Sequence, residues 1–225
     1  MKILILNCDF DPSPETNGAV LIRKQLLNYG YDENNITTTN LFDNQFPEKN
    51  TLSSFSRIII TGSRASAYGN TPWVKKFLDL IHMIDDLSIP TLGICFGFHA
   101  VTQALSGNIR LSDVGEEGFV EVKLSQDGIN HPLFNDFPQQ FLVYQSHCDI
   151  IEKFPLNAVL LAQNNHSIQS YAIRNFVCIQ FHPEITPSVA KTMAVRDGRN
   201  IKQILNSVDE NYNLPTKIIE NFLKS

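Results

Sequence analysis

The sequence predicts an α/β fold: a mostly parallel central sheet flanked by helices, with extra antiparallel strands in the second half. Through the first half, short apolar runs rich in β-branched residues alternate with helical spacing, which is typical of βα units and a parallel sheet. In the second half, strand-like runs follow one another with only turn signals between them. The 225 residues can bury one sizeable core, so we expect a single domain over residues 1–225.

The elements of the first half are marked by periodicity and by glycine and proline. In order, they are a strand over residues 2–7, a helix over 19–27, a strand over 57–61, a helix over 72–84, a strand over 90–94 and a helix over 96–105. Gly30 and Gly107 follow helices as stop signals, and Pro72 suits a first helical turn. A loop of mostly small residues, 62–66, follows the second strand.

Five strand-like runs and a helical tail make up the second half. The strands are expected over residues 119–124, 141–144, 159–162, 170–173 and 177–181. From residue 188 onward the pattern is helical in pieces, with Pro215 at the start of the last piece. We expect the helical tail, 196–225, to cap the sheet.

Composition argues against several classes of partner and cofactor. The 18 basic and 23 acidic residues give a net charge of −5, and no cluster of Lys or Arg suggests a nucleic-acid surface. The apolar opening, residues 1–6, is too short for a signal peptide, and no run approaches membrane-spanning length. The four cysteines are widely spaced without a CxxC pair, so we expect neither a disulfide framework nor a metal site. We also expect no cofactor. A cytoplasmic protein that binds neither nucleic acid nor membrane is the expectation.

Cys95 is the first candidate for catalysis. It stands in the run Gly-Ile-Cys-Phe-Gly between the strand over 90–94 and the helix over 96–105. A sharp strand-to-helix turn needs small residues two before and two after its nucleophile, and it would expose the thiol beside a helix N-terminus that favours thiolate. An isolated cysteine is more often a small buried hydrophobe. A catalytic interpretation therefore requires a base elsewhere in the chain.

His182 and Glu184 can supply that base and a carboxylate to orient it. They follow the strand over 177–181 in the tripeptide His-Pro-Glu. Pro183 disfavours helix at His182, and in an extended chain residues two apart point the same way, so Glu184 can reach the imidazole. Together with Cys95 they would form a Cys-His-Glu triad. On its own, the tripeptide is better explained as an ordinary surface turn.

Taken together, these motifs resemble those of the class I glutamine amidotransferases. The resemblance rests on residues 61–63, 93–97 and 181–184 in the correct order, and it covers roughly residues 55–190. Segments 131–134 and 145–149 are also similar to segments of that family. The closest likeness is to stand-alone proteins similar to the glutaminase domain of GMP synthase. The resemblance implies the flavodoxin-like fold of that family.

The family also implies a mechanism. Cys95 would attack a γ-glutamyl amide carbon to give a thioester and release ammonia or an amine, and water would regenerate the thiol. His182 would act first as base and then as acid. The resemblance places the oxyanion and substrate-binding groups at Gly62, Ser63, Phe96, His99 and His147, with backbone N–H groups of Phe96 and the Gly62 loop facing the oxyanion.

Two positions depart from the family pattern. A glutamine that helps to hold free glutamine usually stands four residues after the nucleophile, where this chain has His99. A glycine usually follows the histidine that matches His147, and here that residue is Cys148. His99 could contact a different γ-glutamyl compound or simply pack at the start of its helix, and both options stay open.

Three functions are compatible with parts of this pattern. The first is a cysteine hydrolase or transferase acting on a small γ-glutamyl substrate, either glutamine or a γ-glutamyl peptide. It would pass ammonia to a separate synthetase subunit or work alone as a γ-glutamyl hydrolase, and His99 favours the second. Residues after 190 are too few for an ATP-dependent module. The alternative is a catalytically idle binding or regulatory protein that keeps the fold. A cysteine hydrolase of another α/β family fits the His-Pro-Glu segment poorly.

Overall fold

A computed structural model describes residues 1–206 and 208–225. Its strands are β1 (Ile3–Asn7), β2 (Ile36–Asn40), β3 (Arg57–Ile60), β4 (Thr91–Ile94), β5 (Asn108–Leu124), β6 (Gln140–Lys153), β7 (Val159–Gln163), β8 (Ile168–Ile173) and β9 (Phe176–Ile179). The described residues join them in one nine-stranded sheet of order β2-β1-β3-β4-β9-β8-β7-β5-β6. Neighbours from β2 to β9 run parallel, and those from β9 to β6 run antiparallel. The predicted mixed α/β sheet is confirmed.

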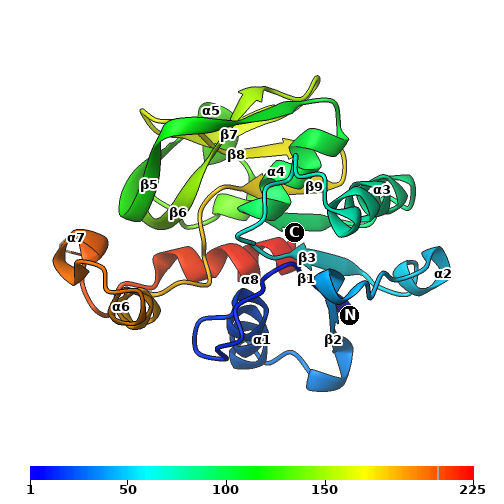
Figure 1. Ribbon diagram of the computed structural model, residues 1–225, viewed down its shortest axis with the longest axis horizontal. Coiled ribbons are helices and arrows are strands. Elements are labelled where there is room, and N and C mark those ends of the chain that lie inside the picture. The colour runs from blue at the N-terminus through cyan, green and yellow to red at the C-terminus, as the bar shows by residue number, and fades with distance from the viewer. Residues whose placement is uncertain (207) are drawn as a thin grey trace.

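Helices cover both faces of the parallel half (Figure 1). The α-helices are α1 (Gly18–Asn28), α2 (Lys49–Leu52), α3 (Pro72–Asp86), α4 (Phe96–Ala104), α5 (Gln126–Ile129), α6 (Pro187–Arg196), α7 (Ile201–Leu205) and α8 (Lys217–Lys224). Single 3₁₀ turns lie at η1 (Glu33–Asn35), η2 (Leu41–Asp43), η3 (Pro132–Phe134) and η4 (Leu214–Thr216). Among the described residues, no helix is both long and apolar enough to cross a bilayer.

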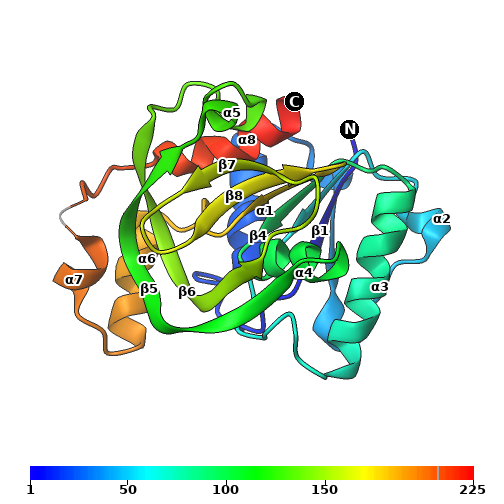
Figure 2. The same ribbon diagram turned by 90° about the horizontal axis from the view of Figure 1, so that it is seen from above.

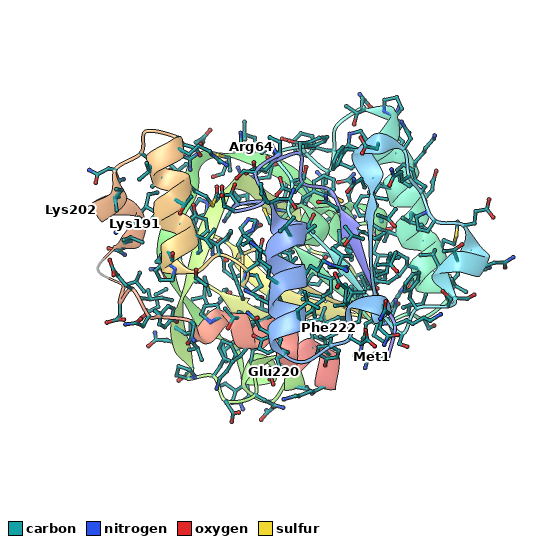
Figure 3. The ribbon with its side chains drawn as sticks, turned by 90° about the horizontal axis from the view of Figure 1, so that it is seen from below. Met1, Arg64, Lys191, Lys202, Glu220 and Phe222 are labelled. Carbon is teal, nitrogen blue, oxygen red and sulfur yellow. The ribbon has the colours of Figure 1, made fainter. Side chains whose placement is uncertain are left out.

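The side chains of β1 alternate between two cores, as a strand buried on both faces requires. Ile3 and Ile5 belong to the core that contains α1 and α8, whereas Leu4 and Leu6 belong to the core under α3 and α4. In the tail, α8 buries four side chains against the first core, and α1 and α8 lie together on that face (Figure 3).

The structure differs from the predicted elements in several places, among them the short helices α2 and α5, which were not predicted. The edge strand β2 was not predicted, because its run Ile-Thr-Thr-Thr-Asn buries only Ile36 and lacks an apolar pattern. The strands β5 and β6 extend to 17 and 14 residues and form a long curved antiparallel pair (Figure 2). Their full length was not predicted, because much of β5 is exposed and carries no alternating signal. Finally, β9 ends at Ile179, two residues earlier than expected.

The parallel strands bring four distant parts of the chain to one edge of the sheet. The segments that follow the carboxyl ends of β1, β3, β4 and β9 contain Asp9, Gly62, Cys95 and His182, respectively. In open α/β sheets this edge is where ligands bind. The fold therefore gathers at one edge segments that are far apart in the sequence, from Asp9 to His182.

Candidate active site

Cys95 occupies a strained turn between β4 and α4. Its φ of 49° and ψ of −97° are unusual for a residue with a side chain, and its N–H donates to the carbonyl of Ile179 at 2.8 Å. The flanking glycines are required by contact, because a Cβ on Gly93 would lie 3.0 Å from the carbonyl carbon of Gly97. Cys95 is only 5% exposed, whereas the sequence predicted an exposed thiol at this turn. The exposure is low because the segments that carry Gly62 and His182 cover the residue.

His182 and Glu184 are joined directly. Nδ1 of His182 lies 2.8 Å from Oε1 of Glu184, which is 2% exposed. The two meet in a turn, in which the Ile185 N–H donates to the His182 carbonyl at 3.3 Å, and not in the extended segment expected from the sequence. Burial opposes the charged imidazole, but Glu184 and Cys95 outweigh burial and raise the pKa of His182 well above its ordinary value.

Gly62 brings the loop after β3 against both Cys95 and His182. A Cβ at this position would lie 2.7 Å from Cε1 of His182 and 3.6 Å from Cβ of Cys95, so only glycine fits. Ser63 shapes the same loop, because its hydroxyl accepts the N–H of Ala65 at 3.1 Å. The Phe96 N–H opens the first turn of α4, where backbone donors have no partner within the helix.

Two cavities flank the thiol. The larger, of about 540 Å³, extends towards His99 and His147, and the smaller, of about 100 Å³, extends towards His182 and Glu184. The residues that line both are Ser63, Arg64, Cys95, Ser146 and Arg199. A substrate bound across this junction would place its two halves on opposite sides of the sulfur.

His99 lies on the wall of the larger cavity and is 4% exposed. Burial and, after it, the charge of His147 lower the pKa of His99 to about 3, so the ring is neutral at physiological pH. Its Nε2 has no hydrogen-bond partner among the described residues. The side chain is thus a neutral polar group on the wall of the cavity, and the Gln180 side chain and the Asp149 backbone lie close enough to it to affect its pKa.

His147 also reaches the larger cavity, but both of its ring nitrogens are engaged. Nδ1 is 3.0 Å from the Asp149 carbonyl oxygen, and Nε2 is 3.2 Å from Oε2 of Glu116. Burial alone would raise the pKa of Glu116, but His147 and Asn164 hold it below its ordinary value. Cys148 lines the same cavity and adds a side chain where the family pattern has a glycine.

Several residues at the site are not singled out by the sequence. Asp9 lies in the smaller cavity, where its Oδ2 accepts the N–H of Gly18 at 2.8 Å. Asp9 lies two residues beyond the carboxyl end of β1, and this position is the one signal in the sequence that could have identified it as a site residue. Arg64 directly follows the Gly62-Ser63 pair, yet an exposed arginine in a loop carries no signal by itself.

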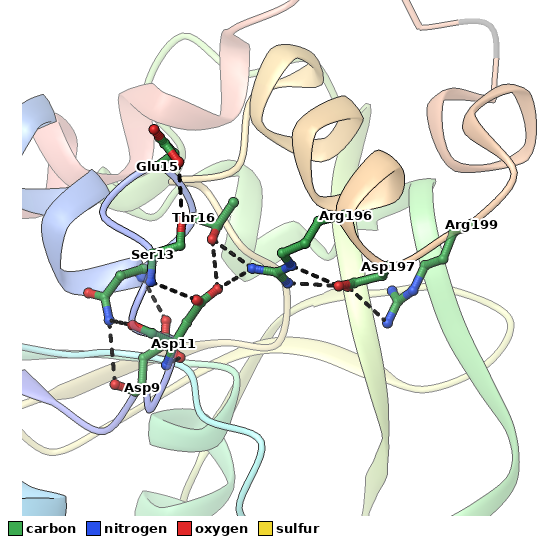
Figure 4. Close-up of polar contacts among 10 residues, drawn as sticks. Asp9, Asp11, Ser13, Glu15, Thr16, Arg196, Asp197 and Arg199 are labelled. Carbon is green, nitrogen blue, oxygen red and sulfur yellow. Dashed lines mark hydrogen bonds and ion pairs between the residues drawn. The ribbon is translucent and has the colours of Figure 1, made fainter.

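The rim of the smaller cavity is a charged network from two ends of the chain (Figure 4). Arg196 contacts Asp11 at 2.6 Å and Asp197 at 2.7 Å, and Arg199 contacts Asp197 at 3.6 Å and also pairs with Glu117. The pKa of Arg196 is raised by its bonds to Asp197 and Asp11. Within residues 1–206 and 208–225, no group of three or more His, Cys, Asp or Glu side chains is placed to hold a metal ion.

The comparisons with known proteins agree on one family. The family model described as "Glutamine amidotransferase class-I" matches residues 21–200. The chain is 30% identical over 168 residues to gamma-glutamyl peptidase 4 of Arabidopsis thaliana, covering 72% of this chain and 67% of that protein. It is 34% identical over 134 residues to a glutamine-hydrolysing GMP synthase of Thermosipho africanus, covering 57% of this chain but only 24% of the synthase.

Solved structures share the fold. A glutamine amidotransferase from Thermotoga maritima superimposes with a TM-score of 0.81 at 19% identity, covering 100% of this chain and 96% of that one. At this identity the likeness is one of fold.

Proposed function

Since the chain belongs to the class I glutamine amidotransferase family, we propose that it hydrolyses γ-glutamyl amides through a thioester on Cys95. The observation that carries the proposal is the arrangement of three side chains at one sheet edge. Cys95 stands on a strained turn, and His182 beside it is held by the buried carboxylate of Glu184 at 2.8 Å. This is the arrangement that a nucleophile, a base and an orienting group require.

The proposed reaction has two halves. The Cys95 thiolate attacks the γ-carbonyl carbon, and the sulfur–carbon bond forms as the amide carbon–nitrogen bond breaks. His182, carrying the proton taken from the thiol, gives it to the leaving nitrogen. A water molecule then loses a proton to His182 and attacks the thioester, which releases glutamate and returns the proton to the sulfur. The raised pKa of His182 suits the acid role in the first half.

Backbone donors would stabilise the negative oxygen formed in each half. We assign this role to the N–H groups of Phe96, at the first turn of α4, and of Gly62, on the loop that touches His182. Removing one such donor typically costs about 10²–10³ in rate. The larger cavity beside His99 would then receive the glutamyl group.

Of the two substrate classes, γ-glutamyl peptides are favoured over free glutamine. A neutral histidine stands where family members that use free glutamine carry a glutamine. Delivery of ammonia to a separate synthetase subunit is the second route, and the GMP synthase relatives provide its precedent. The two routes predict different preferred substrates.

Glutamate release from glutamine and from a panel of γ-glutamyl dipeptides tests the proposal. We expect turnover of about 1 s⁻¹ or faster on at least one dipeptide, slower turnover on glutamine, and loss of activity in Cys95→Ser and His182→Ala variants. A γ-glutamyl electrophile should label Cys95 in the native protein, as seen by mass spectrometry, and should do so far more slowly in His182→Ala. Absence of both turnover and labelling would leave an idle binding protein as the better description.

A further inference from the structure

Arg64 stands at the junction of the two cavities without a carboxylate partner. It lines both the larger and the smaller cavity, and it follows the loop that presents Gly62 to the reacting groups. Figure 3 shows it at the opposite edge of the molecule from Met1, which places it at the carboxyl-end edge of the parallel strands. Within the part of the chain that the structure describes, its guanidinium forms no salt bridge.

The other arginines of this rim are already engaged. Arg196 is held between Asp11 and Asp197, and Arg199 is held by Glu117 and Asp197. Three carboxylates, those of Asp11, Asp197 and Glu117, therefore more than offset the charges of these two side chains. Arg64 remains available for an anion that is not part of the protein.

Arg64 reaches the side of the site where the leaving group departs, as well as the other side. In the proposed reaction, His182 protonates the leaving nitrogen, and His182 lines the smaller cavity only. Asp197 lines the same cavity. Hydrogen bonds from Arg196 hold the pKa of Asp197 below its ordinary value, and the positive charge of Arg64 lowers this pKa further. The charge of Arg64 is thus felt on the leaving-group side of the sulfur.

We propose that Arg64 binds the carboxylate of the leaving amino acid or peptide and so selects γ-glutamyl amino acids and peptides over glutamine. This inference rests on the proposed function and adds a specificity-determining residue to it. A guanidinium offers paired donors that match a carboxylate. Ammonia, which leaves from glutamine, has no carboxylate, so Arg64 would give glutamine no advantage.

The test compares two substrates that differ only in that carboxylate, γ-glutamylglycine and γ-glutamylglycinamide. For Arg64→Ala we expect kcat/KM on γ-glutamylglycine to fall by about tenfold to a hundredfold, and kcat/KM on the amide to stay within about twofold of the native value. Arg64→Lys should fall between, because lysine keeps the charge but loses the paired donors. Arg110→Ala, at an exposed arginine that lines neither cavity, is the matched control and should change neither value.

Two outcomes would overturn the assignment of Arg64 while leaving the hydrolase proposal intact. An equal loss on both substrates would mean that Arg64 binds the glutamyl half, and no loss on either would mean that it binds no substrate. Calorimetric binding of both compounds to Cys95→Ser, with and without Arg64→Ala, separates recognition from turnover. A carboxylate preference that disappears with Arg64 supports the inference even if hydrolysis fails, and equal binding of the two compounds refutes it.

Discussion

Gly62 and His182 are in such close contact that a methyl group on the glycine would lie 2.7 Å from Cε1 of the imidazole. Gly62→Ala should therefore push the ring away from Cys95 or move the loop that carries the proposed oxyanion donor. With either displacement, we expect kcat to fall by at least about a hundredfold. Steady-state kinetics on the preferred γ-glutamyl dipeptide will measure it, with circular dichroism to check that the variant folds.

Gly30→Ala is the matched control for this substitution. Gly30 has a φ of +83°, and a methyl group on it would have no neighbour within 4 Å, so alanine there adds backbone strain without touching the site. It should lower the free energy of unfolding by about 1 kcal/mol and leave kcat unchanged. If both variants lost activity equally, general destabilisation would explain the effect and the contact with His182 would not.

Glu184→Gln should move the alkaline limb of the pH profile of kcat/KM to lower pH. The Glu184 carboxylate stabilises the imidazolium and helps to raise the pKa of His182. Glutamine keeps the size of the side chain but removes the charge, so the proton on His182 is lost at lower pH and the acid for the leaving group disappears sooner. An alkaline limb that does not move would show that His182 is not the group that titrates there.

His99→Gln should shift the substrate preference towards free glutamine. His99 lines the larger cavity, and glutamine would supply an amide there in place of the imidazole. We expect the ratio of kcat/KM for glutamine to that for γ-glutamylglycine to rise about tenfold. Because the pKa of His99 is about 3, the native ratio should stay constant between about pH 5 and 8. A native ratio that changes through this range would contradict a neutral ring.

The strongest local signals in the sequence correspond to contacts that involve only neighbouring residues. A Cβ on Gly93 would meet the backbone of Gly97, so this contact lies within a five-residue window, whereas a Cβ on Gly97 would meet Ile60 of β3 at 2.8 Å, a contact that the window does not contain. His182 and Glu184 are two residues apart, and their contact at 2.8 Å could be predicted even though the backbone there is a turn and not extended. Short-range geometry allows such predictions because few conformations are available to a few residues.

Contacts between distant segments gave no comparable signal. Arg196 contacts Asp11, which lies 185 positions away in the sequence. The residues around either one carry no pattern that predicts this contact. The same holds for Glu116, which meets His147 only because the register of β5 and β6 places them opposite each other. That register depends on strands whose exposed portions lack an apolar pattern, so the polar lining of the cavities could not be derived from the sequence.

Arg196 provides a stability prediction with a definite dependence on pH. Burial would raise the pKa of Asp11, but hydrogen bonds that include one from Arg196 hold it below its ordinary value, and Arg196 lowers the pKa of Asp197 in the same way. A carboxyl with a lowered pKa stabilises the fold above its unfolded pKa of about 3.9, and this contribution is lost as pH falls through the folded value. Arg196→Ala should therefore lower the free energy of unfolding by about 1 kcal/mol at pH 7 and by less in acid.

Lys191→Ala is the control on the same helix, because its pair with Glu210 is long, at 3.7 Å, and both side chains are more than half exposed. It should change the free energy of unfolding by less than about 0.5 kcal/mol at any pH. Urea unfolding at pH 7 and pH 3.5 measures both variants. A loss for Arg196→Ala that is as large at pH 3.5 as at pH 7 would show that packing of the arginine stem, and not its charge, joins α6 to the loop that carries Asp11.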